Sequence, residues 1–441
     1  MRKQILLSIT LLLSFSLFAQ DNKQSFSLQE AIDYALQNNR TAKNAARDIE
    51  AAVEQKWETT STGLPQLNAT VDYQNQIKQQ FEAIDFDMDG VPDFGARHSM
   101  TASANLTQKV FDGSYLVGLQ SAKVFLEISK NAKEKTDLEV RKAVIEAYGN
   151  VLLAEESVQI FERNISVLQK NLDETTKIFE NGLGEEESVE QLQITLSGVQ
   201  SNLNNTKRLK TIAYQMFNIT IGQDINTTPT LTDNLMGLAE YNIVLSLLDA
   251  KEDYENTIDY KIAENDKRSK ELLLKLEKSK ALPTLDAFLN GSYIANRNAF
   301  DFADFSNRWI GTATFGASLR IPIFSSLGRS AATQRARINL EKAQDDLLET
   351  EQKLLLQIKS AKSNYQFAIE DYNIKKDNLA LAERIEQKNQ IKFFEGIASS
   401  FELSQAQTQL YGAQQDYLQA MVNVINNKAE LETILNQIPK N

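Results

Sequence analysis

The sequence predicts an α+β membrane protein in which each chain contributes four β-strands and several long, coiled-coil α-helices, arranged as two internal repeats. Three observations support this prediction. Short motifs recur in the same order in the two halves of the chain. Four segments alternate between apolar and polar residues. The remaining segments contain few helix-breaking residues, since the 441 residues include only 17 glycines and 6 prolines.

The internal repeat is anchored by three motifs. Each second copy lies roughly 215 residues after the first, and the order is the same in both halves. We therefore expect each half to run helix, strand, loop, strand, long helix, turn, helix. The three pairs of motifs are residues 64–67 with 282–285, 110–111 with 323–324, and 181–183 with 395–397.

The N-terminus has the pattern of a secretory signal peptide. Arg2 and Lys3 precede an uncharged apolar segment, and the small residue Ala19 stands at the expected cleavage point. We therefore expect an exported mature chain. The predicted segments are a signal peptide at 1–19, a first repeat at 20–229, a connector at 230–257 and a second repeat at 258–441. The first repeat is expected to contain strands at about 65–81 and 98–111 and a turn at 181–187. The second is expected to contain strands at about 283–297 and 308–324 and a turn at 395–399.

The composition excludes several classes of function. The formal net charge is −12, and the chain has no basic cluster, which argues against a nucleic-acid partner. The chain has no cysteine and a single histidine, His98, so zinc sites and Cys–His or Ser–His catalysis are excluded. No glycine-rich phosphate loop is present. We therefore expect no enzymatic activity.

Each of the four alternating segments has one apolar and one polar face. In the first segment, Leu67 and Val71 alternate with Asn68 and Thr70. The same rhythm continues through the other three segments, with Phe288 as the exception in the third. Strict alternation over this length is typical of strands that separate two environments.

Two features favour a membrane barrel over a soluble sheet. Segments near ten residues have the length needed to cross a bilayer at a tilt, and aromatic residues cluster where the segments meet their loops. After the signal peptide no run of about 18 apolar residues occurs, so a closed barrel is the remaining way to span a membrane. Four strands cannot close a barrel, whereas a homotrimer with twelve strands can. The aromatic residues are Phe81, Phe86, Phe300, Phe302, Phe305 and Trp309.

The other segments predict long helices. No proline occurs between residues 114 and 180 or between 327 and 395, and each stretch would be roughly 100 Å long as a helix. Apolar residues follow heptad steps, as in Leu354, Ile358 and Ala361 and again in Leu403 and Ala406. A single narrow apolar stripe leaves the other faces in water, as in the wall of a tube.

The ordered set of motifs resembles the TolC family of outer-membrane efflux proteins. The resemblance covers essentially the whole mature chain. It implies a trimeric, 12-stranded β-barrel with four strands per chain in the outer membrane, continued by an α-helical periplasmic tunnel. The motifs that carry it are residues 27–39 as the first helix, Leu64-Pro65 before the first strand, Val110–Gly113 and Pro322–Phe324 at the strand-to-helix crossings, and Gly182-Leu183 and Gly396-Ile397 at the periplasmic turns.

The resemblance also implies a function. Such proteins are passive exit ducts for efflux or secretion, and they work with a periplasmic adaptor (membrane fusion protein) and an inner-membrane transporter. The alternative from another class is a periplasmic coiled-coil scaffold, which explains the heptads and the signal peptide but not the four alternating segments. A third class, an outer-membrane hydrolase, lacks a nucleophile–base pair.

Candidate site residues lie at the two turns. The resemblance implies a periplasmic constriction formed by Glu402, Gln405, Ser188 and Gln191, although the uncharged Gln405 departs from the acidic residue of the family. The segments 188–191 and 399–402 also have the pattern of capping boxes, which equally explains Glu402. The resemblance also implies that the turns bind the adaptor, through Gly182, Leu183, Glu185, Glu186, Glu187, Gly396 and Ile397. The two glycines are expected to be left-handed helix caps. The acidic run at 185–187 is also typical of a solvated helix start.

The acidic loop between the first two strands is a candidate calcium site. Asp85, Asp87 and Asp89 alternate as at the start of a calcium loop, and Asp93 follows. The closing glutamate of an EF-hand is absent. The alternative is a polar Asx-rich loop. No other cofactor is expected.

Overall fold

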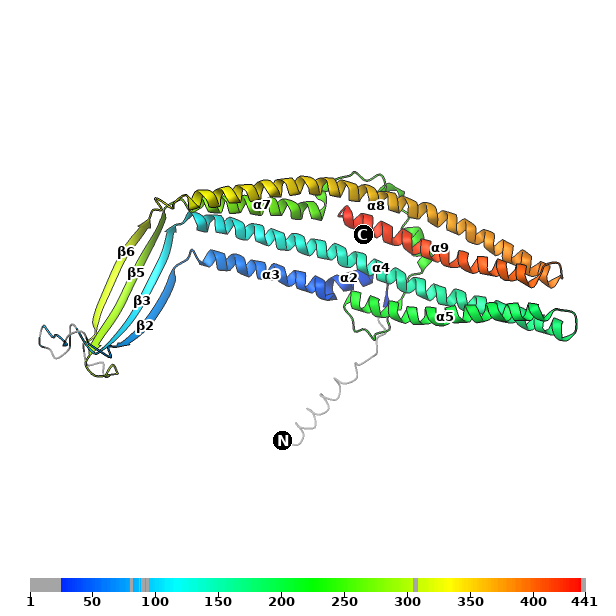
Figure 1. Cartoon of the computed structure of the whole chain (residues 1–441), viewed down its shortest axis with the longest axis horizontal. Helices are drawn as coiled ribbons and strands as arrows, with labels where there is room; N and C mark the ends of the chain where they lie inside the picture. Colours follow the sequence, from blue (N-terminus) through cyan, green and yellow to red (C-terminus); the bar gives the residue numbers. More distant parts are fainter. Residues whose placement is uncertain are drawn as a thin grey trace, which may run out of the picture. The chain divides into compact units, whose positions relative to one another are not determined.

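The computed structural model describes residues 25–79, 82–86, 88, 92, 95–303 and 308–437. The predicted signal peptide lies outside these residues. The two halves of the chain repeat the same series of elements, as the sequence predicts (Figure 1). Within the described residues, no helix combines the length and the apolar character that a membrane-spanning helix needs.

The first half begins with a two-residue strand and ends with a long helical hairpin. Its elements are β1 (Ser25–Phe26), α2 (Leu28–Asn38), α3 (Arg40–Ser61), β2 (Gln66–Asn75), β3 (His98–Phe111), α4 (Gly113–Glu180) and α5 (Glu186–Ile221).

The second half follows a connector. The connector carries β4 (Thr230–Leu231), α6 (Leu235–Tyr241) and the short 3-10 helices η1 (Leu245–Leu247) and η2 (Tyr254–Asn256). The second half contains α7 (Ile258–Ser279), β5 (Thr284–Arg297), β6 (Ile310–Arg320), α8 (Gly328–Phe394) and α9 (Ser400–Ile434).

Two compact units cut across the two repeats. One unit, Arg47–Asn131 with Lys261–Thr350, contains the four long strands and the helix segments next to them. The other contains Ala132–Tyr260, the chain from Glu351 onward and the segment before Arg47. Each half of the chain contributes to both units, so neither repeat is a domain by itself.

The four long strands form one antiparallel sheet in the order β2-β3-β5-β6. Their register aligns Leu67, Leu106, Leu289 and Phe315 in one row. The predicted separation of apolar and polar faces is therefore confirmed. β2 ends at Asn75, before the expected bound of about 81. The next row on the opposite face consists of Asn68, Asn105, Asn290 and Thr314.

Aromatic residues gather at the loop end of this sheet. The ring centroids of Tyr73 and Phe300 are 5.3 Å apart, and those of Phe302 and Trp309 are 6.5 Å apart. The Tyr73 hydroxyl lies 2.8 Å from Nδ1 of His98. The predicted aromatics Phe300, Phe302 and Trp309 thus belong to one cluster with the only histidine. Of the other predicted aromatics, Phe86 is exposed, and Phe81 and Phe305 lie outside the described residues.

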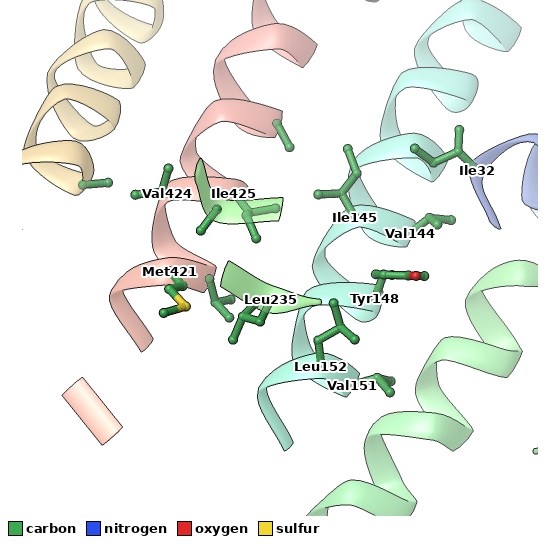
Figure 2. Close-up of a cluster of buried hydrophobic side chains, with 14 of the residues drawn as sticks. Ile32, Val144, Ile145, Tyr148, Val151, Leu152, Leu235, Met421, Val424 and Ile425 are labelled. Atoms are coloured by element: carbon green, nitrogen blue, oxygen red, sulfur yellow. The ribbon is translucent and has the colours of Figure 1, made fainter. Parts of the chain in front are cut away.

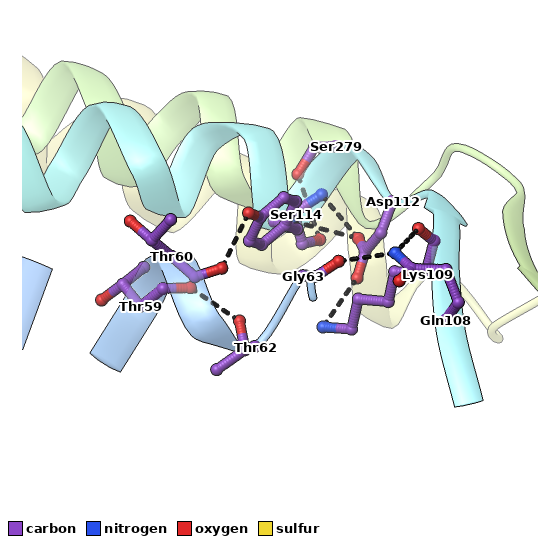
Figure 3. Close-up of polar contacts among 10 residues, drawn as sticks. Thr59, Thr60, Thr62, Gly63, Gln108, Lys109, Asp112, Ser114 and Ser279 are labelled. Atoms are coloured by element: carbon purple, nitrogen blue, oxygen red, sulfur yellow. Dashed lines mark hydrogen bonds and ion pairs between the residues drawn. The ribbon is translucent and has the colours of Figure 1, made fainter. Parts of the chain in front are cut away.

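A polar network joins strand to helix at the opposite end of β3 (Figure 3). The side-chain amide of Gln108 donates to the carbonyl oxygen of Gly63 over 2.7 Å. The Asp112 carboxylate accepts from the backbone N–H of Ser114 over 2.8 Å, which satisfies a free donor in the first turn of α4. The hydroxyls of Ser114 and Ser279 are 3.2 Å apart and tie α4 to α7.

The core of the helical unit gathers side chains from both repeats and from the connector (Figure 2). The buried hydroxyl of Tyr148 lies 2.9 Å from the carbonyl oxygen of Phe26 and 2.9 Å from Oδ2 of Asp233. Burial raises the pKa of Tyr148. The core residues around it include Ile32, Val144, Ile145, Val151, Leu152, Leu235, Met421, Val424 and Ile425.

The predicted heptad stripes are confirmed in α8 and α9. Leu354, Ile358 and Ala361 are buried in α8, and Leu403 and Ala406 are buried in α9. The prediction that only one stripe is apolar is wrong for α8. Its exposed face carries a second apolar row, part of it at heptad spacing, formed by Leu356, Phe367, Ile374 and Leu381.

A glycine at the end of α5 allows close contact with α2. Gly222 has φ +86°, and a Cβ there would lie 2.4 Å from the carbonyl oxygen of Asn38. We expect Gly222→Ala to destabilise the helical unit by about 2–3 kcal/mol because the methyl group meets both a positive φ and a backbone atom. Thermal unfolding followed by circular dichroism should show a lower midpoint.

The matched control is Gly198→Ala, in the interior of α5. A Cβ at Gly198 meets nothing within 4 Å, so the change should be neutral or stabilising because alanine is the better helix former. Equal midpoints for the two variants would contradict the assigned role of Gly222.

Candidate functional site

The candidate site is built on the turns that join α4 to α5 and α8 to α9. Gly182 has φ +74°, and Gly396 has φ +73°. The N–H of Gly182 donates to the carbonyl three residues before it over 2.8 Å, and that of Gly396 does so over 3.0 Å. The next residues, Leu183 and Ile397, donate to the carbonyls five residues before them over 3.0 and 2.8 Å. Both turns are therefore Schellman motifs, and the predicted left-handed glycine caps are confirmed.

Both turns present apolar side chains to solvent. The exposed fraction is 83% for Leu183 and 70% for Ile397. In many Schellman motifs the residue after the left-handed position packs on the last turn of the helix, but these two side chains remain exposed. Phe401, in the first turn of α9, is 67% exposed as well.

The two turns differ in how the next helix begins. Ser399 is the N-cap of α9, and its hydroxyl and backbone N–H both contact the Glu402 carboxylate, so this capping box is confirmed. The capping box predicted at Ser188 is wrong. The N-cap of α5 is Glu185, whose side chain makes no capping hydrogen bond, and Ser188 lies inside the helix. The helix starts earlier because Glu186 and Glu187 occupy its first turn, where acidic side chains are stabilised by the helix dipole.

Glu402 is an exposed, ionised carboxylate. It accepts from the backbone N–H of Ser399 over 2.8 Å and from the Ser399 hydroxyl over 3.1 Å. These hydrogen bonds lower the pKa of Glu402, with a smaller contribution from the charge of Lys392. The side chain is therefore negative at neutral pH.

The structure brings only part of the predicted constriction together. The Gln191 side chain donates to the hydroxyl of Ser404 in α9 over 3.4 Å, so it joins the two hairpins. Glu402 and Gln405 lie on an exposed part of α9. Ser188 is half-buried near the start of α5.

The two hairpins are joined by paired amides. The Asn164 side chain of α4 donates to Oε1 of Gln414 in α9 over 2.8 Å. The Gln390 side chain of α8 donates to Oδ1 of the buried Asn171 over 3.1 Å. Burial raises the pKa of Glu386 in the same region. The contact inside the first hairpin is apolar instead and consists of Phe161, Leu168, Leu172, Leu192, Val199 and Leu203.

Metal ligation can be examined only among the residues that the structure describes. Among the described residues, no group of three or more His, Asp or Glu side chains is placed to hold a metal ion. The candidate calcium positions Asp87, Asp89 and Asp93 lie outside the described residues, and Asp85 is the one member that is described. The calcium site stays a prediction.

Comparison with known proteins decides the family. The family model for "Outer membrane efflux protein" matches residues 31–221 and 263–437, which together are well over half of the chain. The chain belongs to the outer membrane efflux protein family. The protein is thus an outer membrane efflux channel of tripartite pumps and has no enzymatic role. This result decides against the scaffold alternative.

Individual relatives of this outer membrane efflux protein agree over nearly the full chain. The outer membrane protein TolC of Escherichia coli (strain K12) is 23% identical over an alignment that covers 98% of this chain and 86% of that protein. A crystal structure of CusC has a TM-score of 0.75 at 17% identity and covers 96% of this chain and 95% of that one. The structure of VceC from Vibrio cholerae has a TM-score of 0.72 at 15% identity, with 92% and 95% covered.

Two features of this efflux protein were not predicted from the sequence. The second apolar row of α8 was missed, although its members at 367, 374 and 381 repeat at heptad spacing. The amide pairs between the hairpins had no distinctive sequence signal, since isolated Asn and Gln residues are common on solvated helix faces.

The capping difference between the turns can be tested with matched serine variants. We expect Ser399→Ala to destabilise the start of α9 by about 1 kcal/mol, because it removes a formed cap. Ser188→Ala should leave the start of α5 unchanged, because that side chain caps nothing. Hydrogen exchange of the first-turn amides should rise about fivefold in the first variant. Equal changes in both helices would contradict the assignment.

Proposed function

We propose that the two helical turns are the surface with which this efflux channel binds the periplasmic adaptor of its pump. The observation that carries the proposal is the pair of exposed apolar side chains, Leu183 and Ile397, at equivalent positions of two Schellman turns. Apolar groups held outward on well-defined turns are typical of binding sites. A homotrimer offers twice as many turns as it has chains, arranged around one axis.

The two turns differ in charge, which favours an adaptor with basic groups at its tip. Glu185, Glu186 and Glu187 follow the first turn and are all exposed. The second turn has no such run. Charge complementarity speeds association and helps to set the register of a complex. The adaptor would thus distinguish the first turn from the second and connect the channel to its inner-membrane transporter.

We further propose that Glu402 supplies a ring of carboxylates at the periplasmic end of the channel. Its capping hydrogen bonds keep it ionised, and threefold symmetry would place one copy in each chain at the same level. Gln405, one turn along α9, adds no charge, so Glu402 alone would attract cations at this level. Ser188 and Gln191 of α5 would complete the polar lining.

Docking at the turns can be tested by photo-crosslinking in living cells. A photoreactive amino acid at position 397 or 183 should become linked to a periplasmic adaptor, which mass spectrometry identifies. The control position is Met236, an apolar residue of α6 that is 53% exposed and lies outside the turns. Native mass measurement should show the same trimer for all three proteins. Adaptor linked equally well from position 236 would count against the turns as the docking surface.

The charge of Glu402 can be tested by cation block of the channel in a planar bilayer. The lowered pKa means that the carboxylate loses its charge at a lower pH than an ordinary glutamate does. Block by spermidine, a polyvalent cation, should therefore be full at neutral pH and weaken only in acid, as Glu402 takes up its proton. Glu402→Gln should weaken block at neutral pH to the level that the wild type reaches in acid, while glutamine retains the capping box.

The control for this experiment is Glu30→Gln. Glu30 forms the same capping box with Ser27 at the start of α2, and its pKa is lowered by the same hydrogen bonds. Because Glu30 lies far from the turns in sequence and on another helix, spermidine block should be unchanged in this variant. Equal weakening in both variants would contradict the charged ring, because Glu30 carries the same charge in the same kind of capping box outside the turns.

A further inference from the structure

The polar face of the sheet is built in regular rows. The hydroxyls of Thr70 and Ser103 are 2.7 Å apart, and those of Ser292 and Thr312 are 2.9 Å apart. These four residues occupy one row across β2, β3, β5 and β6. In a membrane channel the apolar face of such a sheet meets lipid and the polar face meets the aqueous lumen. The rows of hydroxyls and amides therefore line the lumen wall.

Phe288 interrupts this polar wall. Its register partners are Thr107 in β3 and Gly316 in β6, and both belong to the polar face. The rows on either side contain Asp286 and Asn290. Within the strands as described, Phe288 is the one aromatic residue that points to this face. The residue that breaks the alternation of the sequence thus stands in the lumen wall.

Gly316 provides the space in which the Phe288 ring lies. A Cβ at Gly316 would be 2.6 Å from the ring carbon Cζ of Phe288 and 3.1 Å from both Cε atoms. The tip of the ring therefore lies over Gly316, and the side chain leans across β6. Phe288 is half-buried, so part of its ring remains accessible.

The opposite face of the same strand pair carries an equivalent arrangement. Tyr293 lies over Gly311, where a Cβ would be 2.7 Å from a ring carbon. This pair belongs to the apolar, lipid-facing side of the sheet. β5 and β6 therefore carry one aromatic–glycine pair on each face, and the lipid-side pair is a natural control for the lumen-side pair.

The geometry points to Phe288 as a residue that contacts solutes in the channel, and Gly316 leaves the room that its ring needs on β6. The inference rests on the efflux-channel function. An aromatic face attracts organic cations and stacks with flat apolar groups. Asp286 and Lys109 lie opposite each other in the next row, so that row adds no net charge and the attraction depends on the ring. In a trimer, three copies of Phe288 would lie at one level of the lumen. Organic cations with apolar faces would bind briefly at this level, whereas hydrated potassium ions would not bind there.

The test uses the full-length trimer in a planar bilayer, with tetraphenylphosphonium as the organic cation. We expect Phe288→Ser to shorten its blocking events by about two- to fivefold, the range for one exposed cation–aromatic contact. Potassium conductance should change little, because the side chain leans across β6. Phe288→Tyr should retain the blocking events. Phe288→Leu keeps an apolar side chain without the ring and should behave as the serine variant does.

Tyr293→Ser makes a comparable exchange on the lipid side and should leave the blocking events unchanged. Unaltered events in Phe288→Ser, or equal shortening in Tyr293→Ser, would overturn the inference. The native mass of each variant shows whether the trimer has formed, so a folding defect is recognised. A wild-type trimer without any conductance would contradict the channel function itself, whereas a conducting wild type with unchanged events in Phe288→Ser would contradict only the role of this residue.

Discussion

The two edge strands of the four-stranded sheet need hydrogen-bonding partners, and the assembly of the protein follows from this need. β2 and β6 are the edges of the sheet as described, and an edge strand carries backbone groups without ladder partners. In a bilayer each unsatisfied backbone group costs several kcal/mol. A sheet with an apolar row such as the one from Leu67 to Phe315 is therefore completed only by strands of other chains. Channels of this family are trimers, and pairing between β6 of one chain and β2 of the next would supply the missing hydrogen bonds.

Dependence on neighbouring chains extends from the strands to the helices. The buried stripe of α8 packs inside its own chain, where Tyr365 and Tyr372 are almost fully buried. The second row of α8, which includes Phe367 and Ile374, is exposed in the single chain. Heptad rows that stay exposed in one chain are typical of helices that coil against another. The apolar surface of α8 is thus divided between a row buried in its own chain and an exposed row that a helix of a neighbouring chain would cover.

Contacts inside the first helical hairpin are apolar, whereas contacts between the two hairpins include hydrogen bonds between amide side chains. Leu168 and Leu192 belong to the apolar core of the first hairpin, which loses burial if its helices separate. Between the hairpins, Asn164 and Asn171 bond to amides of α9 and α8. Amides that separate can form hydrogen bonds to water instead, so the net cost of opening such a contact is modest. Near the turns, the first hairpin is therefore the stiffer unit and the contact between hairpins the softer one, whereas farther from the turns both hairpins share one apolar core.

The sequence was sufficient for features that depend on local periodicity. The strand faces and the buried row from Leu354 to Tyr372 follow from spacing alone, because a period of two or 3.5 determines which side chains share a face. That Ser188 does not cap α5 could not be predicted in this way. A serine followed by a glutamate or glutamine is a cap only if the helix begins there, and the glutamates before it allowed an earlier start. The role of Phe288 also needed the register, since only the strand pairing places a glycine opposite its ring.

Comparison of the two repeats shows that the backbone conformation at the helix ends is the same in both, whereas the surface residues after the turns differ. Gly182 and Gly396 share a positive φ, and so do Gly222 and Asn436 at the ends of α5 and α9. Asparagine is the non-glycine residue that tolerates this conformation best, so the helix ends are conserved between the repeats even where the residue differs. The residues after the turns diverge instead, with Glu185 leading an acidic run in one repeat and Ser399 a neutral cap in the other. Because the backbones match, the difference between the turns lies in their side chains, and it gives each chain two distinguishable surfaces from one duplicated structure.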